Sequence, residues 1–124
     1  MPTEPFQKII WREMSIAQAR PSIEVASPLL VELVNHASNA LVRCQTAAPP
    51  KGNVDVAPFA LYKHIIEMTD GVQVLMSQSC SWASVPLVRT SFEALMSMEY
   101  IFESAENYAL RSMSWLAQHL RNKL

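Results

Sequence analysis

Glycine and charged side chains are both scarce in this sequence, and each scarcity excludes a class of function. The 124 residues include two glycines and 17% charged side chains, where about 7% glycine and about 25% charge are usual. Phosphate-cradling loops of the Rossmann and P-loop kinds need several glycines close together, so neither is expected. Ten basic and eleven acidic residues give a net charge of −1, which argues against a broad surface for nucleic acid or anionic membrane.

Cysteine and long apolar runs are scarce too. Cys44 and Cys80 are too few and too far apart for a disulfide framework or a thiolate zinc cluster. The longest uncharged run, residues 71–88, contains two glutamines, four serines and a proline, so we expect no membrane span. Charged residues interrupt the first fourteen positions, so we expect no export signal. Two unpaired thiols without such a signal are typical of a cytoplasmic protein.

Hydrophobic residues, in contrast, make up 50% of the sequence, and they recur at helical spacing. At the N-terminus this spacing predicts a short amphipathic helix from about Pro5 to Ala19. Thr3 is the nearby cap, and Pro21 is expected to end the helix.

A long helix is predicted next. Ser27 is a favourable cap and Pro28 a favourable first helical residue, and apolar residues then recur every three or four positions. The two prolines in the loop 49–53 cannot continue a helix, so this one is expected to end near Thr46.

Two further helices follow the loop. The first is predicted over residues 55–79, with Gly71 near its middle permitting either a close helix crossing or a local bend. A serine-rich link at residues 79–84 then leads into the next helix, which has Pro86 in its first turn.

The complete pattern predicts an all-α protein, in which Ser104 offers a cap for the last helix. The economical architecture is an antiparallel up-down helical bundle of three long helices plus a short N-terminal helix. We expect one domain over residues 1–124, with an N-terminal helix and linker at 1–21 and the bundle at 28–124. The last helix meets no glycine or proline before Leu124, which is typical of a C-terminally truncated chain; a complete domain is the alternative.

The residues that most often carry chemistry are isolated from one another. His36, His64 and His119 fall on three different predicted helices, and none has a His or Cys three or four positions away. The Glu-x-x-His signature of di-metal bundles is also absent, so we expect no metal and no cofactor. Cys44 and Cys80 sit among apolar residues and are expected to be buried and inert. With no nucleophile–base pair to name, we assign no catalytic residue and favour a protein that is not an enzyme.

A polar cluster centred on the helix after Pro86 is the candidate site. Helical projection places Arg89, Glu93 and Tyr100 within roughly 40° of one another. Arginine four residues before glutamate is the less favourable order for a surface pair, so the arginine has reason to face another helix, where Asp70 is the obvious carboxylate. The sequence leaves two alternatives, a solvated stripe on the helix surface or an inter-helix network that binds or supports structure.

The same residues carry a resemblance to a known family. The segments at 61–71, 88–95 and 99–101 resemble an uncharacterised bacterial all-helical family, which is filed as a domain of unknown function and grouped with HEPN-like bundles. The similarity covers about residues 28–120. Its most specific element is the Arg-x-x-x-Glu helix of Arg89 and Glu93.

The resemblance implies the bundle and a role for Asp70, Arg89 and Glu93. Active HEPN ribonucleases carry an arginine, four to six residues, and then a histidine. Here Arg111 and His119 are separated by seven residues, so the motif is absent and the resemblance implies no catalytic residue.

We therefore predict a non-enzymatic helical module that associates with itself or with a protein partner. A HEPN-like ribonuclease or nucleotide-binding protein of a toxin or phage-defence system is the alternative, with RNA as a partner that the net charge does not favour. A homo-oligomer is expected because surplus apolar side chains lie on the last two predicted helices. These side chains are Phe92, Phe102, Trp115, Leu116 and Leu120.

Overall fold

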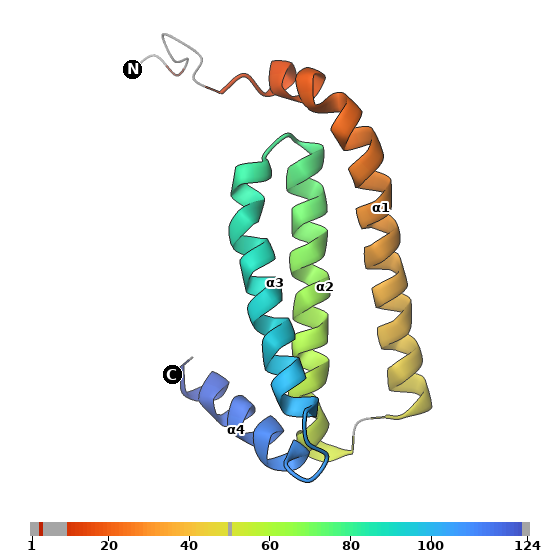
Figure 1. The fold of residues 1–124 in the computed structure, drawn as a ribbon, viewed down its shortest axis with the longest axis vertical. Helices are drawn as coiled ribbons and strands as arrows, with labels where there is room; N and C mark the ends of the chain where they lie inside the picture. The colour runs from red at the N-terminus through yellow and green to blue at the C-terminus, as the bar shows by residue number, and fades with distance from the viewer. Residues whose placement is uncertain (1–2, 4–9, 50, 123–124) are drawn as a thin grey trace.

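The computed structural model describes residue 3, residues 10–49 and residues 51–122, and this part of the chain is all-α, as predicted. Of the described helices, the three long ones run side by side in alternating directions, and a shorter one lies obliquely at one end of the bundle (Figure 1). None of the described helices is both long enough and apolar enough to cross a membrane. In chain order the elements are α1 (Arg12–Ala47), the 3-10 helix η1 (Gly52–Asp55), α2 (Val56–Ser77), α3 (Ser81–Phe102) and α4 (Tyr108–Arg121).

The first long helix, α1, is continuous, so the predicted break between a short helix and a long one is wrong. Pro21 and Pro28 both lie inside it, and each frees the carbonyl four residues earlier, that of Ala17 or Glu24. All four residues are exposed, so water can satisfy these carbonyls. The helix therefore bends towards its N-terminus instead of ending (Figure 1). Residues 5–9 of the predicted short helix lie outside the described part of the chain.

The turn between α2 and α3 is shorter than the predicted serine-rich link. Only residues 78–80 join the two helices, with Ser79 in the left-handed conformation at φ 56°. The serines that follow continue the helix because their hydroxyls bond to carbonyls within it, as that of Ser84 does. Pro86 consequently lies in the second turn of α3 instead of the first.

The predicted close crossing at Gly71 is present between α2 and α3. A Cβ atom at Gly71 would lie 2.9 Å from Cδ1 of Leu87, closer than carbon atoms pack without a shift. The missing side chain therefore allows the leucine to lie directly on α2.

The last helix begins later than predicted, at Tyr108. Ser104 caps a turn instead of the helix, because its Oγ accepts hydrogen bonds from the backbone N and Nδ2 of Asn107, at 3.3 and 3.1 Å. This turn reorients the chain, so α4 packs obliquely against α2 and α3 at one end of the bundle (Figure 1).

The hydrophobic core lies where α2, α3 and α4 meet. Its buried residues are Ala57 and Leu61 of α2 and Ala94 and Ile101 of α3. Four partly buried side chains pack against them, namely Ile65, Met98, Tyr108 and Trp115. This core cluster is therefore small and lies towards one end of the bundle, and Val72 of α2 is buried outside it.

The long helix α1 lies outside this core. None of its residues is buried, and among the described helices it packs against α2 alone. Two hydrogen bonds tie it to α2, from Tyr62 Oη to the carbonyl of Ala37 at 3.3 Å and from Gln73 Nε2 to Ser27 Oγ at 3.0 Å. Cys44 is accordingly exposed, so the prediction of a buried thiol is wrong there.

Candidate functional site

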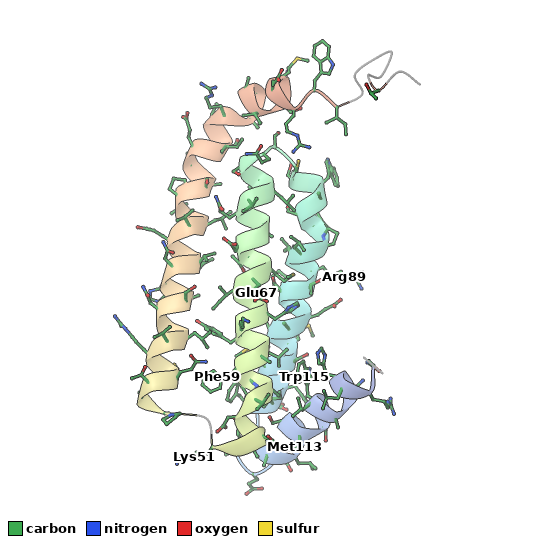
Figure 2. The ribbon with its side chains drawn as sticks, turned by 180° about the vertical axis from the view of Figure 1, so that it is seen from behind. Lys51, Phe59, Glu67, Arg89, Met113 and Trp115 are labelled. Carbon is green, nitrogen blue, oxygen red and sulfur yellow. The ribbon has the colours of Figure 1, made fainter. Side chains whose placement is uncertain are left out.

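The predicted polar cluster separates into two parts in the structure. Arg89 Nε donates to Glu93 Oε1 at 2.9 Å within α3, and the two side chains are 81% and 61% exposed. Arg89 projects away from the bundle (Figure 2). Asp70 is exposed and forms no hydrogen bond or ion pair with any described residue. Of the two alternatives, the solvated stripe is therefore the one that the structure shows for Arg89 and Glu93.

The fourth member of the predicted cluster, Tyr100, contacts a different arginine. The guanidinium carbon of Arg111 lies 4.2 Å above the centre of the Tyr100 ring. Arg111 Nη1 also donates to the carbonyl of Tyr100 at 2.6 Å and to Glu103 Oε2 at 2.8 Å. Its side chain is only 19% exposed, so this arginine fastens α4 to α3.

Two hydroxyl groups fasten α4 to the 3-10 helix η1. Tyr108 Oη donates to Asp55 Oδ1 at 2.7 Å, and the buried Ser112 Oγ donates to the carbonyl of Val54. Burial, followed by the hydrogen bond to Asp55, raises the pKa of Tyr108 to about 12. The same bond, with one from the backbone N–H of Lys51, lowers the pKa of Asp55. These contacts position α4 against the core.

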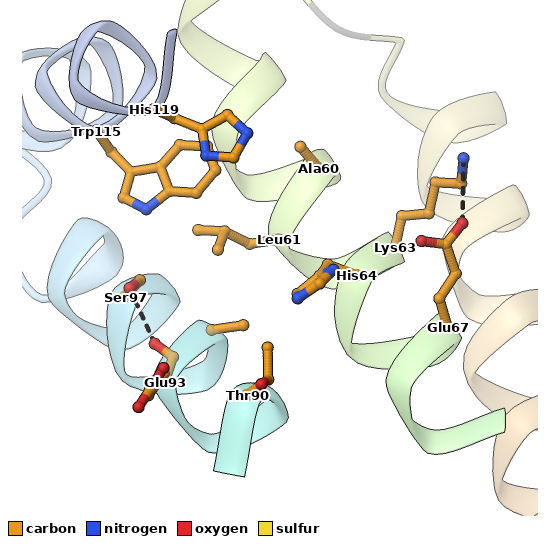
Figure 3. Close-up of a pocket in the computed structure, with 11 residues that line it drawn as sticks. Ala60, Leu61, Lys63, His64, Glu67, Thr90, Glu93, Ser97, Trp115 and His119 are labelled. Carbon is orange, nitrogen blue, oxygen red and sulfur yellow. Dashed lines mark hydrogen bonds and ion pairs between the residues drawn. The ribbon is translucent and has the colours of Figure 1, made fainter. Parts of the chain in front are cut away.

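A cleft of about 470 Å³ with a mixed lining lies between α2, α3 and α4. His64 of α2 and His119 of α4 border it from two sides, and Leu61 lies at its base (Figure 3). The imidazole of His119 stacks on the indole of Trp115, with ring centres 5.0 Å apart and planes 9° from parallel. Thr90, Glu93 and Ser97 border the cleft from α3.

The chemistry available in this mixed cleft is limited by the hydrogen bonds and ion pairs that its polar side chains make. No hydrogen bond among the described residues joins a histidine to a hydroxyl or a carboxylate, so no activated nucleophile is assembled there. Glu93 bonds to Arg89, and Glu67 pairs with Lys63 at 3.4 Å. Within the described chain, no three His, Cys, Asp or Glu side chains are placed to hold a metal ion.

An apolar cavity of about 310 Å³ lies on the other side of the bundle, at one end of the space between α1 and α3. Residues of all four helices line it, among them Ala40, Cys44, Phe59, Tyr62, Phe102 and Tyr108. Both tyrosine hydroxyls are already bonded within the protein, to the carbonyl of Ala37 and to Asp55. The cavity therefore presents aromatic rings and methyl groups without an unpaired tyrosine hydroxyl.

Apolar side chains continue from this cavity along both walls of the space between α1 and α3. Helical spacing from Phe102 leads along α3 to exposed Leu95, Phe92 and Val88, and from Ala40 along α1 to exposed Leu33 and Leu29. The half-buried Tyr62, Thr69 and Met76 of α2 lie between the two rows. We call this face the open groove; its walls are Leu29, Leu33 and Ala40 of α1 and Val88, Phe92, Leu95 and Phe102 of α3.

Comparison of the chain with protein-family models, with curated proteins and with solved structures finds no match. The resemblance to a HEPN-like family therefore stays a prediction from the sequence.

The sequence signals of these features differ in strength. Tyr108 and Ser112 are polar groups four residues apart on the apolar face of the last predicted helix, and that spacing was a usable signal for a polar anchor. Arg111 carried no such signal, because its partners lie at the end of α3 and just after it. For the open groove, the only signal in the sequence was the surplus of apolar residues. Of these residues, Phe92, Phe102 and Leu120 are more than half exposed.

Proposed function

We propose that this protein is a non-enzymatic interaction module, and that its open groove binds an amphipathic α-helix. The observation that carries the proposal is the pair of exposed apolar rows on α1 and α3, which face one space over α2. On α1, Leu29 and Leu33 are 62% and 54% exposed, and on α3, Phe92 is 61% exposed. Contiguous apolar surface of this kind is typical of a binding face.

The shape of the groove favours a helix as its ligand. The helix α2 lies between α1 and α3, which make no backbone contact with each other, so the three helices occupy three positions of a four-helix bundle. A helix of about 22 residues, roughly 33 Å long, matches α3 in length. Helix-in-groove recognition uses apolar anchors at every third or fourth position.

The lining of the groove favours an apolar stripe with few charges. Its seven wall residues carry no charge, and Glu99 is the one charged residue at the spacing of the α3 wall. The hydroxyl of Thr69 is already bonded to the carbonyl of Ile65 at 2.8 Å. A charged group facing this lining would lose its hydration without gaining a partner.

The test uses a fluorescent 22-residue peptide with leucine at the a and d positions and lysine and glutamate elsewhere. We expect it to bind the protein at concentrations where light scattering gives the monomer mass. Leu33→Glu should weaken binding at least tenfold, because it places a charge in the groove wall. Val42→Glu is the matched control, since Val42 is also exposed on α1, at 61% against 54% for Leu33, but lies off the groove, and it should leave binding unchanged. Absence of binding to the monomer, or equal effects of the two variants, would contradict the proposal.

A second candidate is RNA cleavage in the mixed cleft, which the presence of His64 and His119 on two of its sides supports. Two imidazoles can act as a general acid and a general base on a ribose phosphate. Incubation of the protein with total RNA tests this candidate. Cleavage that His119→Ala abolishes and that His36→Ala, at an exposed histidine of α1, leaves intact would favour the enzyme over the interaction module.

A further inference from the structure

We infer that the helix bound in the open groove is α3 of a second copy of this chain. The inference rests on the proposed helix-binding function and names its partner. Two observations carry it: the apolar pattern of α3 and the surplus surface of the chain.

The first observation is that α3 is itself an amphipathic helix of the kind that the groove fits. Val85, Val88, Phe92, Leu95 and Phe102 follow the alternating three- and four-residue spacing of a coiled-coil seam, with Glu99 at the one remaining position. This seam lies next to the face of α3 that packs on α2, and all five of its apolar side chains are exposed.

Exposed apolar groups also extend beyond the seam on α3. Met96 is 67% exposed and Trp82 is 91% exposed, on the arc that faces away from α2. A helix that formed only one wall of a groove would need apolar groups on a narrower arc. A helix that is enclosed by the groove of a second copy meets neighbours on both sides, which accounts for the wider apolar arc.

The second observation is the surface area. The chain exposes 9644 Å², whereas a compact monomer of its mass is expected to expose ~6,700 Å². Eleven residues lie outside the described part, and at the ~160 Å² per residue of an unfolded chain they account for at most ~1,800 Å² of the difference. About 1,200 Å² per chain remains, which matches one side of an obligate homodimer interface.

Two-fold symmetry then sets how the two copies run. In the bundle α1 and α3 lie on the two sides of the groove and run the same way (Figure 1). A two-fold axis parallel to α3 places α3 of the second copy between them and parallel to the first α3, whereas an axis perpendicular to α3 would superimpose α1 of one copy on α2 of the other. Each α3 then enters the groove of the other copy, and both grooves are filled in one closed dimer.

Light scattering and sedimentation equilibrium of the full chain test the inference. We expect a dimer at micromolar concentration. Phe92→Glu should raise the dissociation constant at least about 100-fold, because symmetry places the substitution in the interface twice. Val42→Glu is the matched control, with the same 61% exposure on the outer side of α1, and should leave the dimer intact.

The outcomes separate this inference from the proposed function. A monomer that binds the leucine peptide would overturn the second copy as partner and keep the helix-binding groove. A monomer that binds no peptide would overturn both. A dimer that Phe92→Glu leaves intact would overturn the inference, because self-association would then use another face. A larger assembly that Phe92→Glu and Val42→Glu dissociate equally would also overturn the inference.

Spin labels test the orientation of the two copies of α3. In a Cys44→Ala, Cys80→Ser background, labels at Met96→Cys report the middle of α3 and labels at Trp82→Cys report its start. In the parallel dimer the two labels of each pair lie at the same level of the two helices, so the separations at positions 82 and 96 should be similar. A separation at position 82 well above that at position 96 would indicate antiparallel helices and would overturn the two-fold arrangement.

Discussion

The region where α2, α3 and α4 meet differs from the long helix α1 in how its helices are held in place, although both have the same apolar periodicity. Where α2, α3 and α4 meet, each helix packs against the other two, and the region contains Ala57 and Ile101 with no exposed surface. The 36-residue helix α1 has α2 as its one neighbour among the described helices and contains no buried residue. Periodicity makes a helix amphipathic, but burial depends on how many neighbours cover its apolar face.

The polar contacts follow the same division. Tyr108, Arg111 and Ser112 of α4 all bond to groups on other elements, and the hydroxyl of Ser112 is fully buried. Two hydrogen bonds link α1 to α2, and both are partly exposed. Stability is therefore expected to be uneven, with α1 at the low end.

The largest difference is expected from the same substitution made in the two regions. Leu61→Ala removes a side chain that is 4% exposed in the core, and it should lower the free energy of unfolding by about 3 kcal/mol. Leu30→Ala removes a half-buried side chain of α1 and should cost about 1 kcal/mol. Urea unfolding of both variants at one protein concentration provides the measurement. Equal losses would show that α1 is held as firmly as the core.

The helices themselves could be predicted from the sequence, because apolar spacing and proline positions are local properties. The end of α1 near Thr46 and the start of α2 near Val56 depend on the loop between them and were predicted to within a residue or two. The continuity of α1 was not predictable from the same rules. Pro21 interrupts a helix in general, and it is tolerated here because the carbonyl that it frees is exposed.

A smaller effect, with a characteristic pH dependence, is expected from Tyr108→Phe. The variant removes the hydrogen bond to Asp55 and should cost about 1 kcal/mol at neutral pH. Folding raises the pKa of Tyr108 from about 10 to about 12, so the contribution of the hydroxyl is complete below pH 10. It is lost as the pH rises through the folded pKa. The urea midpoints of the two proteins should therefore converge between pH 10 and pH 12.

The dependence of stability on acid pH provides a second test of the contact between Tyr108 and Asp55. Folding lowers the pKa of Asp55 below its ordinary value of 3.8, so its contribution is present above that pH and is lost as the pH falls below it. The first cause of this shift is the Tyr108 hydroxyl. Tyr108→Phe should consequently reduce the acid-side loss of stability, and an unchanged acid profile would contradict the assignment.

Less of the candidate site than of the fold could be predicted from the sequence. The contact between Arg89 and Glu93 lies within one helix, and its spacing was visible. The contact of Tyr100 with Arg111 and the existence of the open groove depend on how α3 is set against α4 and α1. Those placements are decided by tertiary packing, which local spacing does not encode.

The smallest effect is expected from Arg89→Ala. The side chain is 81% exposed and its partner Glu93 is 61% exposed, so solvent screens the pair and the loss should be under ~0.5 kcal/mol. Arg111→Ala is the matched control, because that arginine is 19% exposed and donates to the carbonyl of Tyr100 in α3 and to the carboxylate of Glu103 just after α3. Removing charged hydrogen bonds of that kind should cost about 2 kcal/mol. Urea unfolding of both variants shows whether the free energy of unfolding falls more for Arg111→Ala than for Arg89→Ala, as the difference in their exposure predicts. A loss of several kcal/mol for Arg89→Ala would show that this guanidinium is covered in solution, and in a dimer built on α3 such a loss would decrease on dilution.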